Sequence, residues 1–408
     1  MTGNPQDDRS RGLNPVDGPM AEVPERYLAR GGEPVTAPAG AAISGSSADM
    51  AARALPGWTL CISTLNRRAV LKKCLEHAYG QTRPPDEVVI VDASDEFEEA
   101  RAEIEALSRH VPLTYIRAEK RSLPAQRNQG IAASTKDILF LIDDDSFMHP
   151  DGAERILELY AADHEEHIAA IAFRNVPFAG PDGGQQVERK KRGLTGAASF
   201  QRIAKSSRVA RWFKREVLMM SMERAFIGYD LPEERARTWS LNDELANEVI
   251  PVSFIAGYAL TARRKVAVHE PFDGNLLAYS PAEDLDATYR YARHGLLVKS
   301  KAAKVHHVEA AAARLKRMQV TTLTLANIAY FVRAKSAARW KHTRRFHLMV
   351  VRRLLAWFLK DLLTLRLTFP NVRGVWRGIR HARGILDYEG PDLPAFFTGV
   401  QKEILAMR

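Results

Sequence analysis

The feature that most constrains this chain is an apolar run that ends in three consecutive acids. Residues Ile138 to Ile142 are all apolar, and Asp143, Asp144 and Asp145 follow without a break. A short continuous apolar run is typical of a strand buried on both faces. Because unpaired buried charge is costly, the acids must lie past the carboxyl end of that strand, where open α/β sheets bind their ligands.

Carboxylates clustered on one short turn repel one another unless a cation lies between them. Oxygen ligands of this kind suit a hard divalent ion such as Mg²⁺ or Mn²⁺, which often binds substrate phosphates as well. Taken alone, the triplet fits a solvated acidic turn equally well, and the rest of the chain decides between the two interpretations.

The totals indicate a globular chain with anionic partners. Its 408 residues suit about two to three domains, and an apolar fraction of 46% supplies a sizeable core. A net charge of +10 favours nucleotide phosphates, acidic lipid or nucleic acid. Cys61 and Cys74 lie in apolar or amphipathic runs, which predicts buried thiols and fits a reducing compartment. The sequence shows no signal-peptide pattern and no uncharged apolar run long enough to span a bilayer.

Strand and helix patterns alternate along the middle of the chain with short connections. Apolar runs predict strands at 58–64, 87–92, 113–116, 138–142, 168–173 and 254–260, and short strands at Val298 and Val305. Helical spacing predicts helices at 68–81, 96–108, 124–133, 153–162 and 283–293. This alternation is typical of a parallel sheet covered by helices, and therefore of an α/β fold.

Three segments depart from this alternation. Residues 1–55 are rich in Gly, Pro, Ser, Ala and Asp without periodicity, which predicts a disordered tail. Residues 178–249 show only weak patterns, and we interpret them as a variable insertion that covers one edge of the site. Residues 311–408 form a basic helical region, in which Asp361 is the only acid of the stretch 314–386.

The basic C-terminal region has an amphipathic pattern. Apolar residues from Phe346 to Leu363 alternate with Arg352, Arg353 and Lys360. A basic amphipathic helix can lie in an anionic membrane surface, which is the interpretation that we favour. The alternative is a helix that packs against the preceding domain and turns its basic face to water.

Five motifs together resemble the family 2 glycosyltransferases in their order and spacing. They are Cys61-Ile-Ser-Thr-Leu-Asn-Arg67, Val89-Ile-Val-Asp-Ala-Ser-Asp95, Ala125-Gln-Arg-Asn-Gln-Gly130, Asp143-Asp-Asp145 and Glu283-Asp284-Leu-Asp286. Each motif is weak alone, and the resemblance covers about residues 57 to 310. It implies the GT-A fold, a Rossmann-like and mostly parallel sheet flanked by helices, in a domain at 56–310. It also implies a metal-dependent, inverting transfer of a sugar from a nucleotide-sugar donor.

The resemblance assigns the first three motifs to the donor. It implies that Thr64 and Asn66 hold the base and ribose, and that Asp92 accepts the imide N–H of uracil or thymine. UDP- or dTDP-sugars are therefore the expected donors. Arg127 and Asn128, at a helix start, would face the same crevice, where the guanidinium suits a pyrophosphate. By themselves, these residues would equally serve as helix caps and as a surface arginine.

The resemblance assigns the acid triplet to a metal. Asp143 and Asp145 would form the Asp-x-Asp pair that binds Mg²⁺ or Mn²⁺, with Asp145 the closer ligand and His307 a third ligand. Asp144 would contact the donor ribose or face away. The ion would neutralise the charge that grows on the departing diphosphate.

The resemblance assigns the last motif to the acceptor. Inversion requires in-line attack by an acceptor hydroxyl, and a carboxylate near that hydroxyl serves as general base. Asp284 is the expected base, Glu283 orients the acceptor, and Gly257 is the small residue that lets acceptor and donor approach. On the residues alone, the two acids would simply cap the helix that follows.

The expected partners are a nucleotide-sugar donor, a glycan or lipid-linked acceptor and an anionic membrane surface, without nucleic acid. These partners suggest polysaccharide or cell-envelope synthesis at the inner face of the cytoplasmic membrane. One alternative is a nucleotide- or nucleic-acid-binding module without transferase activity, built on the basic region and its tryptophans Trp340, Trp357 and Trp376. Another is a nucleotidyltransferase, which would need a glycine-rich phosphate loop that residues 61–68 lack.

Overall fold

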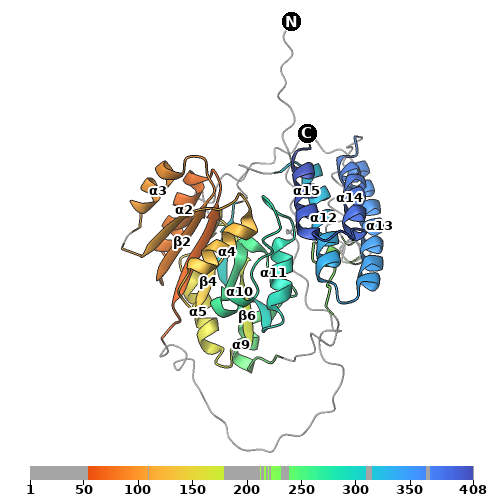
Figure 1. Cartoon of the computed structure of the whole chain (residues 1–408). Helices are drawn as coiled ribbons and strands as arrows, with labels where there is room; N and C mark the ends of the chain where they lie inside the picture. Colours follow the sequence, from red (N-terminus) through yellow and green to blue (C-terminus); the bar gives the residue numbers. More distant parts are fainter. Residues whose placement is uncertain are drawn as a thin grey trace, which may run out of the picture.

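A computed structural model of the chain describes residues 54–108, 110–178, 222–230, 239–308, 315–363 and 368–407, together with residues 212, 216 and 219. The tail expected at 1–55 therefore lies outside the described residues except for its last two positions, as does much of the insertion expected at 178–249. In the described part, helices flank a mixed sheet, and a group of C-terminal helices packs beside it (Figure 1).

The first half of the sheet consists of parallel strands in the order β3-β2-β1-β4. The strands are β1 (Trp58–Thr64), β2 (Glu87–Asp92), β3 (Leu113–Arg117) and β4 (Ile138–Phe140), and the intervening helices are α2 (Arg68–Tyr79), α3 (Phe97–Glu105) and α4 (Leu123–Ala133). Thr64 is in register with Asp92, so the carboxyl ends of β1 and β2 meet at one edge of the sheet.

The second half of the sheet is mixed. It contains β5 (Ser146–Met148), β6 (Ile168–Asn175), β7 (Val249–Pro251), β8 (Leu260–Arg263) and β9 (Leu296–His307), with α5 (Gly152–Ala162), α8 (Met222–Ala225), α9 (Asp243–Glu248), α10 (Arg264–His269) and α11 (Glu283–Tyr291). Strand β8 runs antiparallel to β4 and β6, and β9 runs parallel to β6. The antiparallel pair β5–β9 sets Ser146 opposite His307, directly after the acid triplet.

Both faces of the sheet are covered, because alternate residues of β1 and β4 enter different apolar clusters. Leu60 and Phe140 belong to one cluster, whereas Cys61 and Leu139 belong to the other. The predicted α/β class is confirmed. Cys61 and Cys74 are buried free thiols, as predicted.

Two strand predictions near the site were wrong. The segment expected to be a strand at 254–260 is a loop with a 3-10 turn, η4 (Gly257–Ala259), and β8 begins only at Leu260. The Gly257 amide donates to a carboxylate of α11 and not to a neighbouring strand, which removes this segment from the sheet. The two short strands expected at Val298 and Val305 form the single strand β9.

The C-terminal helices build a second apolar core beside α11 (Figure 1). They are α12 (Arg317–Lys335), α13 (Arg339–Leu363), α14 (Pro370–Leu386) and α15 (Leu393–Leu405). Leu323, Ile328 and Phe331 of α12 are buried, and the same core contains Phe254 and Leu285 from the sheet region. The two regions therefore share one core, so a substitution that changes the packing in one region also affects the packing of the other.

Helix α13 packs against the rest of the protein through one of its faces. Phe346, Met349 and Trp357 are buried in the shared core, so the packing alternative holds for this face. Its opposite face is exposed and is treated further below. Among the helices in the described ranges, none combines the length with the low charge that crossing a bilayer requires.

Asp361 serves as a buried cap between two helices. Its Oδ2 accepts the backbone N–H groups of Asn371 at 3.0 Å and Val372 at 3.2 Å, in the first turn of α14. A carboxylate at a helix N-terminus satisfies amide groups that otherwise lack partners, and it compensates the helix dipole. The single acid of the stretch 314–386 is therefore buried and contributes no negative charge to the surface.

Replacing Asp361 with alanine should destabilise the protein by about 1–3 kcal/mol, because the buried amides of α14 lose their acceptor. The free energy of unfolding in urea measures this loss. Asp387→Ala, at the exposed C-terminal end of α14, is the matched control and should change stability by less than about 0.5 kcal/mol. Equal stabilities of the two variants would contradict the capping role.

Candidate active site

The loop after β1 is bonded to the acid triplet and to β2. The Thr64 hydroxyl donates to Asp144 Oδ2 at 2.7 Å. The Gln126 side-chain amide donates to the carbonyls of Thr64 at 3.0 Å and Val91 at 2.9 Å, and so holds the ends of β1 and β2 together. The sequence offered a sign of this role, since Gln126 lies inside the motif that begins at Ala125, yet the prediction named only its neighbours.

Arg67 is a second residue that the sequence-based prediction missed. Its Nη1 lies 2.8 Å from Asp144 Oδ1 and 3.4 Å from Asp145 Oδ2. Burial raises the pKa of Asp144 to about 6, while Arg67 and the hydroxyl of Thr64 oppose the shift. The structure thus directs Asp144 inward to the loop after β1, where it fixes that loop relative to the triplet.

Asp143, Asp145 and His307 form a candidate cation site. Their ligand atoms all lie within 4.8 Å of one another, and His307 Nε2 is 3.2 Å from Asp145 Oδ1. Two carboxylates and one imidazole are a donor set that suits Mn²⁺, and the carboxylates suit Mg²⁺. The ring of Tyr258 stacks on His307 with centroids 4.4 Å apart and so orients the imidazole.

A second group with ligand-like spacing fits a cation poorly. His269, Glu270 and His294 also offer atoms within 4.8 Å of one another. However, Arg290 and Arg293 contact the Glu270 carboxylate at 3.1 Å and 3.4 Å. Because the charge of Glu270 is already compensated, this group is a structural ion-pair network.

Arg127 connects the metal side of the site to the acid pair of α11. Its Nη2 lies 2.8 Å from Asp143 Oδ1, and its Nη1 lies 2.5 Å from Glu283 Oε1. The side chain is only 3% exposed, and charge-assisted hydrogen bonds are strong where water is excluded. In this structure the two terminal nitrogens hold carboxylates, so the guanidinium organises the acids from both sides.

Gly257 lies directly against that guanidinium. A Cβ atom at this position would lie 2.5 Å from Arg127 Nη2, and the Gly257 amide donates to Asp284 Oδ2 at 3.0 Å. The space that a side chain would need is therefore occupied by Arg127. The close packing of Arg127 against the backbone therefore explains why this position is a glycine.

Two residues expected in the donor site are bonded to other parts of the chain. Asn128 exchanges two hydrogen bonds of 2.8 Å with the backbone of Phe272, which anchors α4 to the segment before α11. Asn66 has a left-handed φ of 54° and pairs with Asp95 through bonds of 2.9 Å and 3.0 Å. In the structure, both side chains hold the site's loops in place.

Asp92 lies at a hollow next to the carboxyl end of β2. Its carboxylate is buried and accepts the Tyr115 hydroxyl at 2.6 Å and the Ser94 amide at 2.8 Å. Arg117 and Arg121 line the same hollow. The hollow therefore places a buried carboxylate beside two cationic side chains, which pair with Glu98 and Asp95.

The two acids that begin α11 differ in their exposure. Glu283 is buried against Arg127, and its Oε2 is a buried oxygen that has no hydrogen-bond partner among the described residues. Asp284 is partly exposed, and its oxygens accept the amides of Gly257 at 3.0 Å and Leu285 at 2.8 Å. Burial raises the pKa of Asp284, and the two amides and Arg127 offset part of this effect.

The residue just before this pair is strained. Ala282 has a φ of 72°, in the left-handed region, where a residue with a side chain pays about 1–3 kcal/mol. Strain of this kind persists only where the surrounding contacts enforce it, and it is common at functional sites. The start of α11 is therefore held in place by its surroundings.

Those surroundings include the C-terminal helices. The Asn327 side chain donates to Ser280 Oγ at 2.8 Å and to the carbonyl of Pro281 at 2.9 Å. Gln401 of α15 accepts the Leu277 amide at 2.8 Å. Helices α12 and α15 thus fix the segment that leads directly into Glu283.

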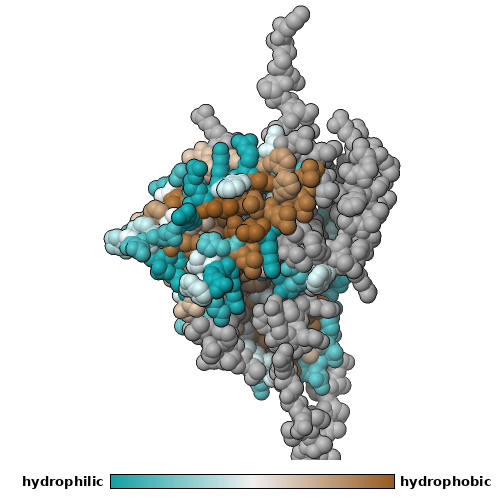
Figure 2. Space-filling view, turned by 90° about the vertical axis from the view of Figure 1, so that its right-hand side faces the viewer, coloured by the Kyte–Doolittle hydropathy of each residue, from teal (hydrophilic) through white to brown (hydrophobic). Residues whose placement is uncertain are grey.

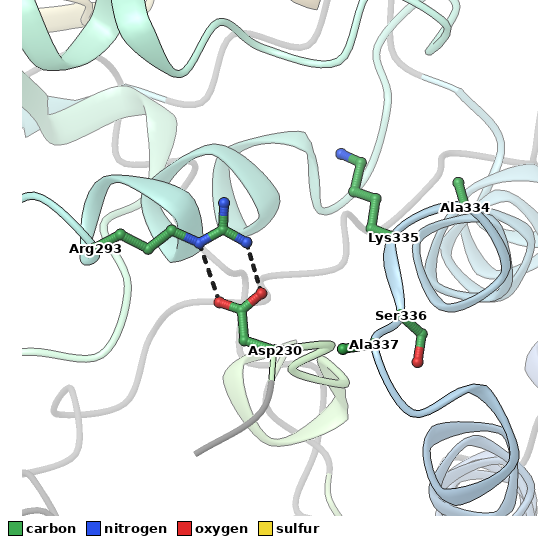
Figure 3. Close-up of a pocket in the computed structure, with 6 residues that line it drawn as sticks. All are labelled: Asp230, Arg293, Ala334, Lys335, Ser336 and Ala337. Atoms are coloured by element: carbon green, nitrogen blue, oxygen red, sulfur yellow. Dashed lines mark hydrogen bonds and ion pairs between the residues drawn. The ribbon is translucent and has the colours of Figure 1, made fainter. Parts of the chain in front are cut away.

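Charged groups add a second attachment between α12 and the segment around α11. Lys335, the last residue of α12, lies 2.8 Å from Asp286 Oδ2 and 2.9 Å from Asp273 Oδ2. Asp230 and Arg293 meet across the same pocket through hydrogen bonds of 2.6 Å and 3.1 Å, as the dashed lines in Figure 3 show. These groups compensate one another's charge, so the pocket joins the two regions.

A mixed α/β sheet whose acids gather past its carboxyl edge defines a GT-A-like protein, and a comparison of the sequence with protein families agrees. Residues 59–220 match the model described as Glycosyl transferase family 2. Over these residues the chain is similar to that family.

A curated relative supports the same assignment over part of the chain. "Uncharacterized glycosyltransferase YwdF" of Bacillus subtilis (strain 168) is 34% identical over 115 residues, which cover 28% of this chain and 42% of the relative. The chain therefore spans less than half the length of this relative.

Solved structures show distant likeness. A mannosyltransferase of Pyrobaculum calidifontis, PcManGT, in complex with GDP-Man and Mn²⁺, is 13% identical and has a TM-score of 0.45 over 86% of each chain. S. aureus TarS 1–349, in complex with UDP-GlcNAc, is also 13% identical and has a TM-score of 0.45 over 85% of this chain and 91% of that chain. At this distance, neither structure bears on the donor of this protein.

Gly257→Ala should weaken the site, because the new methyl group displaces the guanidinium of Arg127 from its two carboxylates. We expect a loss of stability of about 1–3 kcal/mol, measured by thermal unfolding. Gly274→Ala is the matched control, because a Cβ there meets nothing within 4 Å. An unchanged unfolding temperature for Gly257→Ala would show that Arg127 is not held as described.

The acid pair should also make stability depend on pH. Burial raises the pKa of Glu283 to about 8, with Arg127 opposing the shift and Asp284 adding to it. An unfolded glutamate titrates near ~4.3, so between these values the folded chain keeps a proton that the unfolded chain has lost. The contribution of this group to stability therefore falls as the pH rises through that window.

Glu283→Gln cannot ionise and should escape this loss. In the presence of a chelator, the unfolding temperature of the unmodified protein should fall relative to that of Glu283→Gln between about pH 5 and about pH 8.5. Glu98→Gln, at an exposed acid, is the control and should follow the unmodified protein at every pH. Parallel curves for all three proteins would refute the raised pKa.

Proposed function

We propose that this protein is an inverting, metal-dependent glycosyltransferase that moves a sugar from a nucleotide diphosphate to a hydroxyl group. The observation that carries the proposal is the pair of contacts made by Arg127. This one buried side chain joins Asp143, at the cation site, to Glu283, at the acceptor-side acid pair. A transfer reaction requires these two functions in one place, with the acids held apart from each other.

In this proposal Asp284 is the general base. Two backbone amides orient its carboxylate, which keeps partial access to solvent and to an incoming hydroxyl. A raised pKa makes the carboxylate a stronger base for that proton. Glu283 Oε2 is a buried oxygen without a partner in the described residues, and a sugar hydroxyl of the substrate, which can both donate and accept, would satisfy it. Arg127 is a positioning residue that acts through Asp143 and Glu283.

Asp143, Asp145 and His307 would hold the divalent ion, Mn²⁺ or Mg²⁺. When bound, such an ion supplies positive charge next to the leaving diphosphate. Arg67 lies beside the same acids and provides a further cation toward the phosphates. Asp144 and Thr64 keep the loop after β1 in position for the donor.

The hollow at Asp92 supports a pyrimidine donor. The buried carboxylate of Asp92 would accept the imide N–H of uracil or thymine, and Arg117 and Arg121, which line the same hollow, would attract an anionic donor. We therefore favour UDP- and dTDP-sugars. In a thermal-shift screen with Mn²⁺, stronger stabilisation by GDP than by UDP would reverse this choice.

The acceptor in this proposal is a glycan or a lipid-linked oligosaccharide, in polysaccharide or cell-envelope synthesis at the inner face of the cytoplasmic membrane. The support is the positive charge of the C-terminal region. Asp361 is the only acid of the stretch 314–386, and it is buried as the cap of α14. A surface of one sign attracts anionic lipid and the diphosphate of a lipid-linked substrate.

Asp145→Asn should abolish the reaction, because the amide lowers the charge of the cation site and no longer pairs with His307. We expect the release of nucleoside diphosphate from a UDP-sugar to fall by at least about a hundredfold, and Mn²⁺ binding measured by calorimetry to weaken in parallel. Asp137→Asn, at the exposed opposite end of β4, is the control and should retain both. Full activity in Asp145→Asn, or in the presence of a chelator, would refute the metal-dependent mechanism.

A further inference from the structure

The exposed face of α13 carries an apolar stripe that nothing in the described residues covers fully. Leu348, Val351, Leu355, Phe358 and Leu362 are between 43% and 64% exposed. Their spacing of three and four residues places them along one side of the helix. The opposite side holds the residues that pack into the shared core, so α13 is apolar on two faces.

Basic side chains adjoin this stripe. Lys341, Arg344 and Arg345 are exposed in the turns just before Leu348, and Arg352 lies at the edge of the stripe between its members. The guanidinium of Arg344 lies 4.6 Å from the centre of the Trp340 ring. This end of the helix therefore combines cations with an indole that is 73% exposed.

The neighbouring helix α14 adds positive charge. It exposes Arg373, Arg377 and Arg380, together with Trp376, whereas Arg383 lies 3.5 Å from Asp387 just past the helix end. In the stretch 314–386 the only acid is Asp361, which is buried as the cap of α14. Figure 2 looks at the side of the molecule on which α13 and α14 lie, and it shows apolar side chains gathered into one patch that polar side chains border on the left and below.

A second copy of this chain fits the stripe poorly. Helices that pair through such a stripe place the residues at its edges opposite one another, and charges of opposite sign are needed there. Here the edge residues Arg345 and Arg352 would meet arginines of the other copy, with no exposed acid in the described part of 314–386 to pair with them. Like charges in contact are repulsive and disfavour that assembly.

An anionic bilayer meets both requirements of this surface. Its acyl region would bury the apolar stripe, and its headgroups would attract the arginines. Tryptophan side chains such as Trp340 are enriched at the membrane–water interface. We propose that the exposed face of α13, Leu348 to Leu362 with Arg344, Arg345 and Arg352, docks this protein on a negatively charged lipid surface. The inference concerns binding alone and stands whether or not the transferase chemistry is correct.

Vesicle flotation with the full chain tests the proposal, without nucleotide or metal. The protein should float with vesicles of phosphatidylcholine and phosphatidylglycerol, and it should float much less with phosphatidylcholine alone or in high salt, because screening weakens the headgroup attraction. Val351→Asp and Leu355→Asp should each reduce the bound fraction by about tenfold or more, since a charge is costly below the headgroups. Equal flotation of these variants and the unmodified protein would overturn the proposal.

Val268→Asp is the matched control. This valine is 50% exposed on α10, far from α13 in the sequence, and the same charge there should leave flotation unchanged. Arg344→Gln combined with Arg345→Gln should weaken binding to anionic vesicles only. Thermal unfolding of each variant identifies any folding defect. Reduced flotation by variants that unfold at the temperature of the unmodified protein supports the proposal.

Other occupants of the stripe give distinct results. Light scattering that showed a dimer converted to a monomer by Val351→Asp, without flotation of either form, would assign the stripe to a second copy and overturn the proposal. Tighter binding to duplex DNA than to anionic vesicles would overturn it as well. Asp145→Asn should float normally, and Val351→Asp should still release nucleoside diphosphate in solution, so failure of one proposal is distinguishable from failure of the other.

Discussion

A buried guanidinium that holds two carboxylates apart is the constraint on which this site depends. A charge as deeply buried as that of Arg127 persists only when it is paired, and its partners are Asp143 and Glu283. The same group requires Gly257 beneath it, because a methyl group there would occupy the position of its nitrogen. The relative positions of Asp143, Glu283 and Gly257 therefore depend on one side chain.

This arrangement also explains why four acids can lie close together without their repulsion destabilising the fold. Asp143, Asp145, Glu283 and Asp284 would repel one another in an apolar setting. Arg127 lies between two of them, Arg67 contacts Asp145, and backbone amides hold Asp284. Each carboxylate is thus stabilised by a separate partner, which allows the four acids to lie close together.

The parts of the site that the sequence predicted are those where local physics leaves little choice. The apolar run before Asp143 predicted a strand at 138–142, and β4 forms there but ends at Phe140, two residues before the predicted end. The sequence pattern could not show that the side-chain amide of Asn128 donates to the backbone of Phe272, because that partner is 144 residues away in the sequence. Arg67 was missed for a similar reason, since nothing local distinguishes an arginine that neutralises buried acids from one in water.

The helical region illustrates the same limit. Periodicity correctly predicted an amphipathic, basic α13, but composition alone cannot tell a face that packs from a face that remains exposed. That choice depends on α12, whose buried surface extends almost around the helix and offers Leu323 and Phe331 as partners. The sequence pattern of α13 therefore does not separate its two apolar faces. The structure does so, because it shows that one face is covered and the other is exposed.

The contacts of α12 and α15 with residues 277–286 bear on how the two parts of the chain depend on each other. The family match ends at residue 220, whereas the acid pair begins at Glu283 and its segment is held by Asn327, Lys335 and Gln401. Two contacts cross this boundary, since Arg127 pairs with Glu283 and His307 pairs with Asp145. A chimera that replaced only residues 59–220 would therefore have to preserve Arg127 and Asp145 to keep the two parts joined.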